Sequence, residues 1–107
     1  MDQSRLVADY YQCLDDDEYE TLQSLLHPEF VQQRPDRHFE SRAAFVEFMR
    51  TDRPETDTTH RVDTLLESTD SLAVYGRLFD AEGSELFEFI DVFRFDEGQI
   101  REIETYS

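Results

Sequence analysis

The aspartate at position 91 lies among aromatic residues, where a charged side chain is unexpected. Residues 86–106 read LFEFIDVFRFDEGQIREIETY, and strand alternation would place five side chains on one face: Phe87, Phe89, Asp91, Phe93 and Phe95. Removing a carboxylate from water without a partner costs several kcal/mol. Asp91 is therefore expected to keep its proton, to find a hydrogen-bond donor or to serve a function. The alternatives are a half-buried face, or a carboxylate that caps a neighbouring backbone group.

The elements that must position Asp91 begin with helices. Apolar residues at helical spacing predict a first helix over residues 6–14 and a second over residues 19–26. The second helix is expected to stop at Pro28, because the residue before a proline avoids helical angles. Ser41 is placed to cap a third helix, which ends before Pro54.

The second half of the chain changes to a period of two, which is typical of strands. Turn-forming links separate four such runs: residues 58–67, 71–80, 86–95 and 99–106. Residues 30–33 predict a further short strand, followed by a turn at Arg34-Pro35-Asp36. We therefore expect a single α+β domain over residues 1–107, a cone of strongly curved antiparallel or mixed sheet. The three helices of the first half would pack on its concave side and leave a conical pocket.

Composition restricts the function further. The 107 residues include 26 acidic and 10 basic residues, all of the latter arginine, for a formal net charge of −16. Scattered acids without lysine indicate a cytoplasmic protein of a salt-accumulating halophile, and an acidic protein that docks on a basic partner is the alternative. Nucleic-acid binding is disfavoured because no basic stripe exists, and no apolar run is long enough for a membrane helix. The lone Cys13 is expected to be a buried apolar residue, and no Cys and His spacing suggests a zinc site.

The order of elements, together with IDVFRFDEGQI at residues 90–100, resembles the nuclear transport factor 2-like superfamily. Within it, the chain is most similar to the ketosteroid isomerase and SnoaL-like polyketide cyclase branch, over nearly its whole length. The resemblance implies a cone that holds a small apolar or aromatic ligand, and homodimers formed through the outer face of the sheet. It implies no metal and no organic cofactor. Function varies widely across this fold.

Carried over by position, the resemblance gives Asp91 the role of an oxyanion-hole acid that an apolar site keeps protonated. The tyrosine that shares the oxyanion falls on Tyr10, if the first helices align without a gap. Tyr11 is adjacent, and one residue of helix phase decides which of them faces the pocket. Tyr11, Phe89 and Phe93 are then expected to contact the ligand, although a tyrosine here can also be an ordinary core aromatic.

The general base of the isomerases has no counterpart at its usual place. Their base is an aspartate directly before a proline, and the matching dipeptide here is Arg34-Pro35, whose arginine cannot abstract a proton. Asp36, His38 and His60 are substitutes only if the fold turns them inward. Arg34 is instead suited to hold a carboxylate or phosphate of a ligand at the pocket mouth, or it pairs with a nearby acid.

Three functions follow from these residues. The first is an enzyme of the isomerase, cyclase or dehydratase kind that stabilises an enolate with Asp91 and a tyrosine. The second is a non-catalytic binder of an aromatic or polyketide-like molecule, which needs the pocket but no base. The third is a dimeric interaction module whose cone is filled by side chains.

Overall fold

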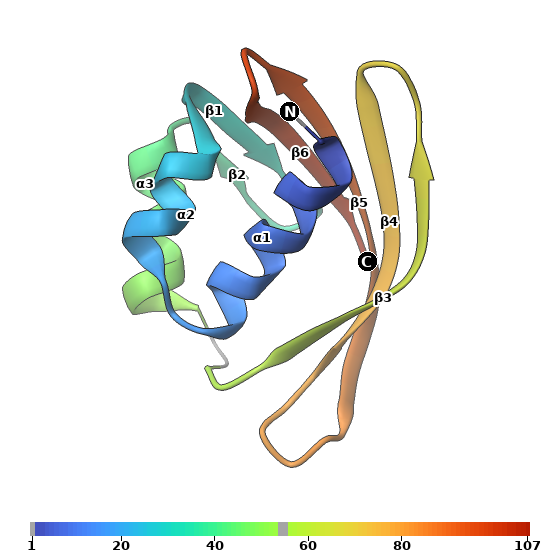
Figure 1. Ribbon diagram of the computed structural model, residues 1–107. Helices are drawn as coiled ribbons and strands as arrows, with labels where there is room; N and C mark the ends of the chain where they lie inside the picture. The colour runs from blue at the N-terminus through green and yellow to red at the C-terminus, as the bar shows by residue number, and fades with distance from the viewer. Residues whose placement is uncertain (1, 54–55) are drawn as a thin grey trace.

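Three helices and a six-stranded sheet make up the computed structural model, which describes residues 2–53 and 56–107 (Figure 1). The helical elements are α1 (Gln3–Asp15), α2 (Tyr19–Leu25) and α3 (Arg42–Glu47), with α3 continued by a π-helical turn, η1 (Phe48–Asp52). The strands are β1 (Leu26–Gln33), β2 (His38–Phe39), β3 (Thr59–Glu67), β4 (Ser71–Phe79), β5 (Glu85–Asp96) and β6 (Gln99–Tyr106). No helix among the described residues is long and apolar enough to cross a membrane.

Helices α1 and α3 begin where short polar side chains accept backbone hydrogen bonds. The Asp2 carboxylate accepts from the Ser4 N–H at 3.0 Å, and the Ser41 hydroxyl accepts from the Ala44 N–H at 3.0 Å. The cap predicted at Ser41 is therefore confirmed. The expected stop at Pro54 lies outside the described residues.

The sheet is mixed, with the strand order β2-β1-β6-β5-β4-β3. Strands β3 to β6 form the expected antiparallel meander, with ends within one residue of the prediction, while β1 pairs with β6 in parallel. The prediction for β1 was too short, because the strand already starts at Leu26 and passes Pro28 through an irregularity between Leu26 and Val31. Strand β2 was not predicted.

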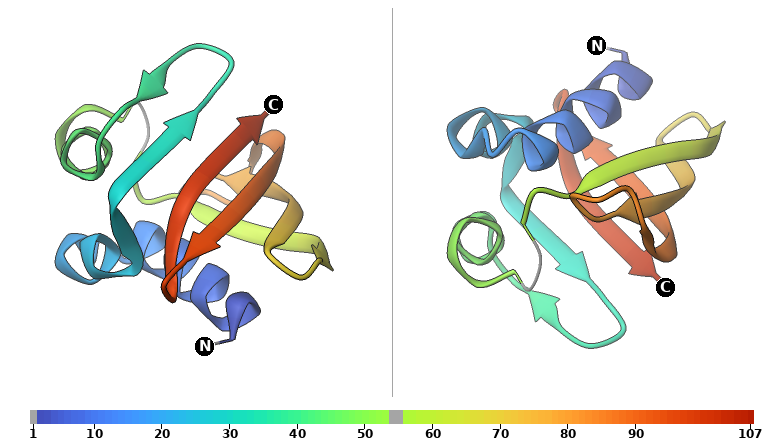
Figure 2. Two further views of the ribbon diagram at one scale, coloured as in Figure 1. Left: turned by 90° about the horizontal axis from the view of Figure 1, so that it is seen from above. Right: turned by 90° about the horizontal axis from the view of Figure 1, so that it is seen from below.

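Irregularities in pairing bend the sheet into an open cone. The β3–β4 register shifts between Val62 and Thr64, and Gly76 lies at this shift. A Cβ on Gly76 would lie 2.6 Å from the Arg61 carbonyl oxygen and 2.8 Å from the Phe89 ring, so no larger residue fits without movement. Figures 1 and 2 show the curled sheet with the helices on one side of it. The edge strands β2 and β3 do not pair, so the sheet is not closed.

An aromatic core fills the space between the helices and the concave face. Phe30, Phe45 and Phe93 are completely buried, together with aliphatic residues of α2, β4 and β6. Cys13 is buried in the same core and is a free thiol, as expected. The three helices therefore pack on the concave side, as the sequence predicted.

Candidate active site

A cavity of about 350 Å³ opens between α1, η1 and the concave side of the sheet. Its wall is formed by residues of α1, β1, the turn after β1, η1 and strands β3 to β6. Most of the area of this wall is apolar, with Leu14, Met49 and Phe89 among its members, while half of the lining residues carry polar or charged side chains. Such a composition is typical of small-molecule sites.

Asp91 lies at the inner wall of this cavity and is 6% exposed. The Tyr11 hydroxyl donates to its Oδ2 at 2.6 Å, and the Thr105 hydroxyl donates to its Oδ1 at 2.6 Å. The Gln32 side-chain amide in turn donates to the Thr105 hydroxyl at 2.9 Å. Four residues from α1, β1, β5 and β6 thus form one buried polar chain.

Burial raises the pKa of the Asp91 carboxyl above its ordinary value. The hydrogen bonds from Thr105 and Tyr11 lower this pKa, as do His60 when its ring is protonated and the charge of Arg34, but these effects only partly offset burial. Burial, reinforced by the nearby Asp91 charge, also holds the pKa of Tyr11 well above its ordinary value. Asp91 therefore keeps its proton to a higher pH than an exposed aspartate, and Tyr11 stays a neutral phenol. Protonated Asp91 can then donate a hydrogen bond to a ligand oxygen. Tyr11, whose single O–H donates to Asp91, can donate to that oxygen by turning away from the carboxyl.

Tyr10 also faces the cavity, but the hydrogen bond to Asp91 comes from Tyr11. The Tyr10 ring packs edge-on against Tyr11 and Phe93, with centroids 5.1 and 5.4 Å apart. Burial and the charge of Asp91 raise its pKa, and the charge of Arg34 lowers it. The resemblance placed the acid's partner at Tyr10, and the structure places it one residue further along α1.

His60 forms a tight pair with Asp15, the last residue of α1. The His60 Nδ1 lies 2.6 Å from the Asp15 Oδ1, and the His60 backbone N–H donates to both carboxylate oxygens at 3.2 and 3.1 Å. Because a carboxylate can only accept a hydrogen bond, Nδ1 must carry a proton. In the neutral ring, Nε2 then has a free lone pair. His60 lines the cavity, and its ring centroid lies 5.0 Å from that of Tyr11. The pair has the form of a histidine base oriented by a carboxylate.

The other predicted site residues lie in different places. Arg34 and Asp36 line the cavity from the turn after β1, with the Arg34 Nε 3.8 Å from Asp36 Oδ1. His38 is exposed in β2, 3.4 Å from Glu40, and does not reach the cavity wall. Phe89 lines the cavity, whereas Phe93 is completely buried behind the two tyrosines and does not. The prediction that Phe93 touches a ligand is therefore not supported by its position.

Sequence reasoning missed three members of the site: Gln32, Thr105 and Asp15. Thr105 faces Asp91 across the β5–β6 pair only because the register shifts between Arg94 and Phe95. Asp15 and His60 are 45 residues apart in the chain. The acidic run that begins at Asp15 indicated the end of a helix and gave no sign of a partner.

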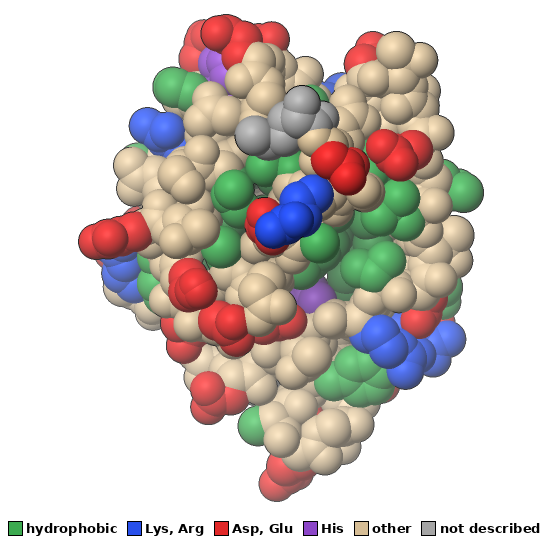
Figure 3. All heavy atoms as spheres, viewed as in Figure 1, with side chains coloured by type: hydrophobic (Ala, Val, Ile, Leu, Met, Phe, Trp, Pro, Cys, Tyr) green, Lys and Arg blue, Asp and Glu red, His purple; other side chains and the backbone are tan. Residues whose placement is uncertain are grey.

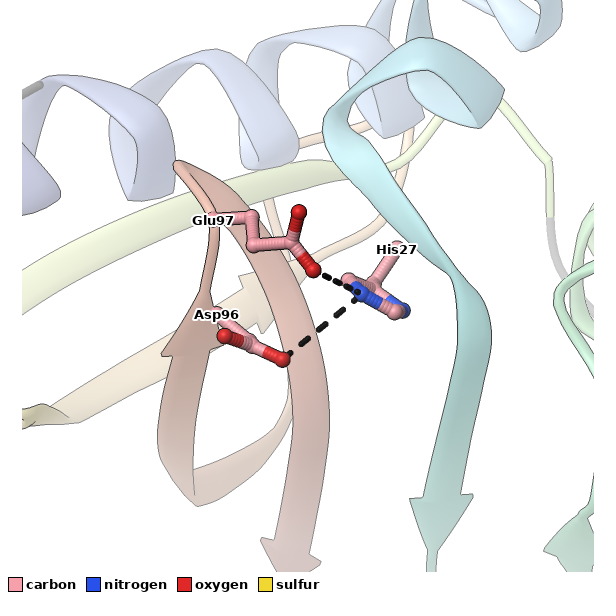
Figure 4. A group of neighbouring side chains, drawn as sticks. All are labelled: His27, Asp96 and Glu97. Carbon is pink, nitrogen blue, oxygen red and sulfur yellow. Dashed lines mark ion pairs between the residues drawn. The ribbon is translucent and has the colours of Figure 1, made fainter.

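A second polar group lies outside the cavity, where His27 meets Asp96 and Glu97 (Figure 4). The His27 Nε2 is 3.7 Å from a carboxylate oxygen of each acid. Its Nδ1 accepts a hydrogen bond from the Glu29 N–H at 3.0 Å, so the proton of the neutral ring lies on Nε2. A metal ligand needs the opposite arrangement, with a lone pair on Nε2 and an acceptor facing Nδ1–H. The geometry thus favours a loose electrostatic contact between β1 and the β5–β6 turn over a metal site.

Comparison with known proteins places this chain in a family. Residues 7–103 match the family model of the SnoaL-like domain. A comparison with curated proteins found no match.

Solved structures share the fold over nearly the whole chain. An NTF2-like protein of unknown function from Cytophaga hutchinsonii superposes with a TM-score of 0.84 at 14% identity, covering 99% of this chain and 89% of that one. A protein from Sinorhizobium meliloti, provisionally assigned as a polyketide cyclase, gives 0.83 at 14% identity, with coverages of 95% and 94%. One from Kribbella flavida, provisionally assigned as a ketosteroid isomerase, gives 0.82 at 20% identity, with coverages of 94% and 73%. With the fold shared and the family model matched from Val7 to Ile103, the chain belongs to the SnoaL-like domain family.

Proposed function

We propose that this SnoaL-like domain binds a small apolar carbonyl compound in its cone and stabilises the enolate of that compound. The observation that carries the proposal is the 2.6 Å hydrogen bond between Tyr11 and Asp91 at the wall of an open, largely apolar cavity. A carboxyl whose pKa is raised by burial and a neutral phenol are the kinds of donor that a developing oxyanion requires.

His60 supplies the base that the sequence lacked at Arg34. Asp15 holds the Nδ1 side of the ring, which leaves Nε2 to take a proton from the carbon next to the carbonyl. The proton leaves carbon for Nε2, the electron pair moves to the carbonyl oxygen, and Asp91 and Tyr11 stabilise the negative charge there. Return of the proton to a different carbon would complete an isomerisation.

A non-catalytic binder is the alternative, and the arginine at the usual base position favours it. A side-chain-filled interaction module is less well supported, because the cone contains a cavity of about 350 Å³.

Hydrogen–deuterium exchange at the α-carbon of 2-tetralone, followed by NMR in high-salt buffer, tests the proposal. We expect catalysed exchange that falls by about 10²- to 10⁴-fold in His60→Gln. Asp15→Asn should retain binding and lose part of the exchange. The exposed His38→Gln is the matched control and should exchange like the parent protein.

Binding of 2-naphthol, whose hydroxyl occupies the place of an enolate oxygen, separates the alternatives. Tyr11→Phe should weaken it, and Tyr75→Phe, whose hydroxyl donates to Glu88 outside the cavity, should not. Binding without exchange would reduce the protein to a binder. Absence of both would overturn the proposed function.

A further inference from the structure

The charges on the cavity wall have the opposite sign to those of the rest of the molecule. Of the ten arginines of the chain, three line the cavity: Arg34, Arg37 and Arg53. Of the 26 acids, the described wall contains only Asp36 and Asp91, and burial keeps Asp91 protonated to a higher pH than usual. A cationic wall inside a chain of net charge −16 is not what scattered surface pairing would produce.

Arg53 is committed to holding the fold. Its Nη2 donates to the Asp17 carboxylate at 2.7 Å, to the Tyr19 hydroxyl at 3.2 Å and to the Leu14 carbonyl at 3.3 Å. These bonds connect the residues after η1 to the end of α1 and the start of α2. Arg53 is therefore not available as a ligand anchor.

Arg34 is differently placed. It is the first residue of a turn from Arg34 to Arg37. The Arg34 backbone N–H closes this turn by donating to the Arg37 carbonyl oxygen at 2.9 Å. The Arg34 Nε is buried and, like that of Arg53, has no hydrogen-bond partner among the described residues, since the nearest Asp36 oxygen is 3.8 Å away. A buried guanidinium N–H without an acceptor is costly, and an oxygen of a ligand would remove that cost.

The neighbours of Arg34 set the charge that the mouth can accept. Asp36 lies between Arg34 and Arg37, 3.5 Å from the Arg37 Nε, and the Arg37 guanidinium lies over the Phe48 ring at 4.4 Å. Two arginines and one carboxylate leave one positive charge, which matches a monoanion better than a dianionic phosphate. The charge of Arg34 also acts on Tyr10 and Asp91, so mouth and inner wall belong to one site.

From this arrangement we infer that the ligand is a small oxo-carboxylic acid. Its carboxylate binds Arg34 at the mouth, its apolar body lies against Phe89 and Phe48, and its carbonyl oxygen reaches Asp91 and Tyr11. The inference deepens the proposed function by naming the ligand class of the same site.

Four fluorescent naphthalene probes test the inference and keep it separate from the proposed function. The pair 6-hydroxy-2-naphthoate and 2-naphthol differs only in the carboxylate, while 2-naphthoate and 2-naphthyl phosphate carry the anion without the hydroxyl. We expect the hydroxynaphthoate to bind about ten- to hundredfold more tightly than naphthol, as a charge-assisted hydrogen bond predicts. Arg34→Gln should remove this advantage, so that the hydroxynaphthoate and naphthol bind that variant with similar affinity.

Arg5→Gln is the matched control, because it removes the same charge from an exposed residue of α1 that pairs only with Asp9 in the described structure. It should bind all four probes like the parent protein. Equal affinity for the hydroxynaphthoate and naphthol, or an advantage that survives in Arg34→Gln, would overturn the inference. Tighter binding of the phosphate than of 2-naphthoate would overturn the choice of a carboxylate. If 2-naphthol does not bind but 2-naphthoate binds and loses affinity in Arg34→Gln, the carboxylate site at Arg34 is supported and the proposed oxyanion site is contradicted.

Discussion

At the scale of single residues, the buried Asp91 affects both the proposed function and the stability of the fold. Its pKa is raised in the folded state, so the folded protein holds this proton more tightly than the unfolded chain does. The contribution to the free energy of unfolding is complete below the ordinary aspartate pKa and is lost as pH rises through the higher folded-state pKa. A wild-type chain at neutral pH therefore carries a cost that a neutral amide would not.

Asp91→Asn should consequently keep the fold and gain stability relative to the wild type as pH rises above the ordinary aspartate pKa of about 4. Denaturant titrations of both proteins in high salt, over a series of pH values, measure this difference. Asp70→Asn, in the exposed turn between β3 and β4, is the control and should show no such trend. A stability difference between Asp91→Asn and the wild type that does not change with pH would contradict the raised pKa.

Asp91→Lys should abolish soluble expression, because it places a longer, charged side chain where Asp91 is buried. Normal folding of that variant would contradict the burial.

Only part of this site was predictable residue by residue. Asp91 was predictable because alternation alone places it among phenylalanines. The choice between Tyr10 and Tyr11 depended on a helix phase that local sequence does not determine. A regular β5–β6 hairpin, counted from its turn, would place Glu104 opposite Asp91. The register shift between Arg94 and Phe95 places Thr105 opposite Asp91 instead.

At the scale of elements, the strands were predictable where alternation is long and turns are marked. Strands β3 to β6 have both signals, and their ends agree with the prediction. Strand β2 contains two residues, too few for any period, and β1 crosses a proline that normally interrupts pairing. The contact between Asp15 and His60 depends on the packing of α1 against β3, which no local pattern encodes.

The convex face of the sheet carries exposed apolar residues that a monomer has little reason to keep. Ile90 and Tyr106 are paired neighbours on it, 44% and 52% exposed, and Leu66 on β3 is 66% exposed. Because the resemblance implies homodimers formed through this face, we expect it to pair with a second copy of the chain.

Light scattering after size exclusion in high salt should therefore give the mass of a dimer, and Ile90→Lys should shift it to the monomer. Leu65 is also exposed but shares the concave face with its partner Val74, so Leu65→Lys serves as the control and should stay dimeric. A monomeric parent protein would contradict the expectation. Loss of the dimer in both variants would show that the change acts through stability.

At the scale of the whole molecule, electrostatic repulsion is the dominant feature of the surface. The net charge is −16 over 107 residues, and Figure 3 shows acidic side chains scattered over the visible face instead of gathered in one block. Charges spread in this way repel one another over distances of about 10 Å at 0.1 M salt and only about 3 Å at 1 M. Folding brings them closer together, so low salt destabilises the folded state.

The free energy of unfolding should therefore rise steeply between about 0.1 M and 1 M KCl. Urea titrations at each salt concentration measure it, because urea is uncharged. A triple variant, Glu67→Gln, Asp70→Asn and Glu82→Gln, removes three exposed charges that form no ion pair with a described residue. If repulsion is the cause, this variant is more stable than the parent at low salt and responds less to KCl, whereas sucrose stabilises both equally. An identical salt response in the two proteins would instead assign the effect of KCl to burial of apolar surface, which salting-out strengthens without regard to charge.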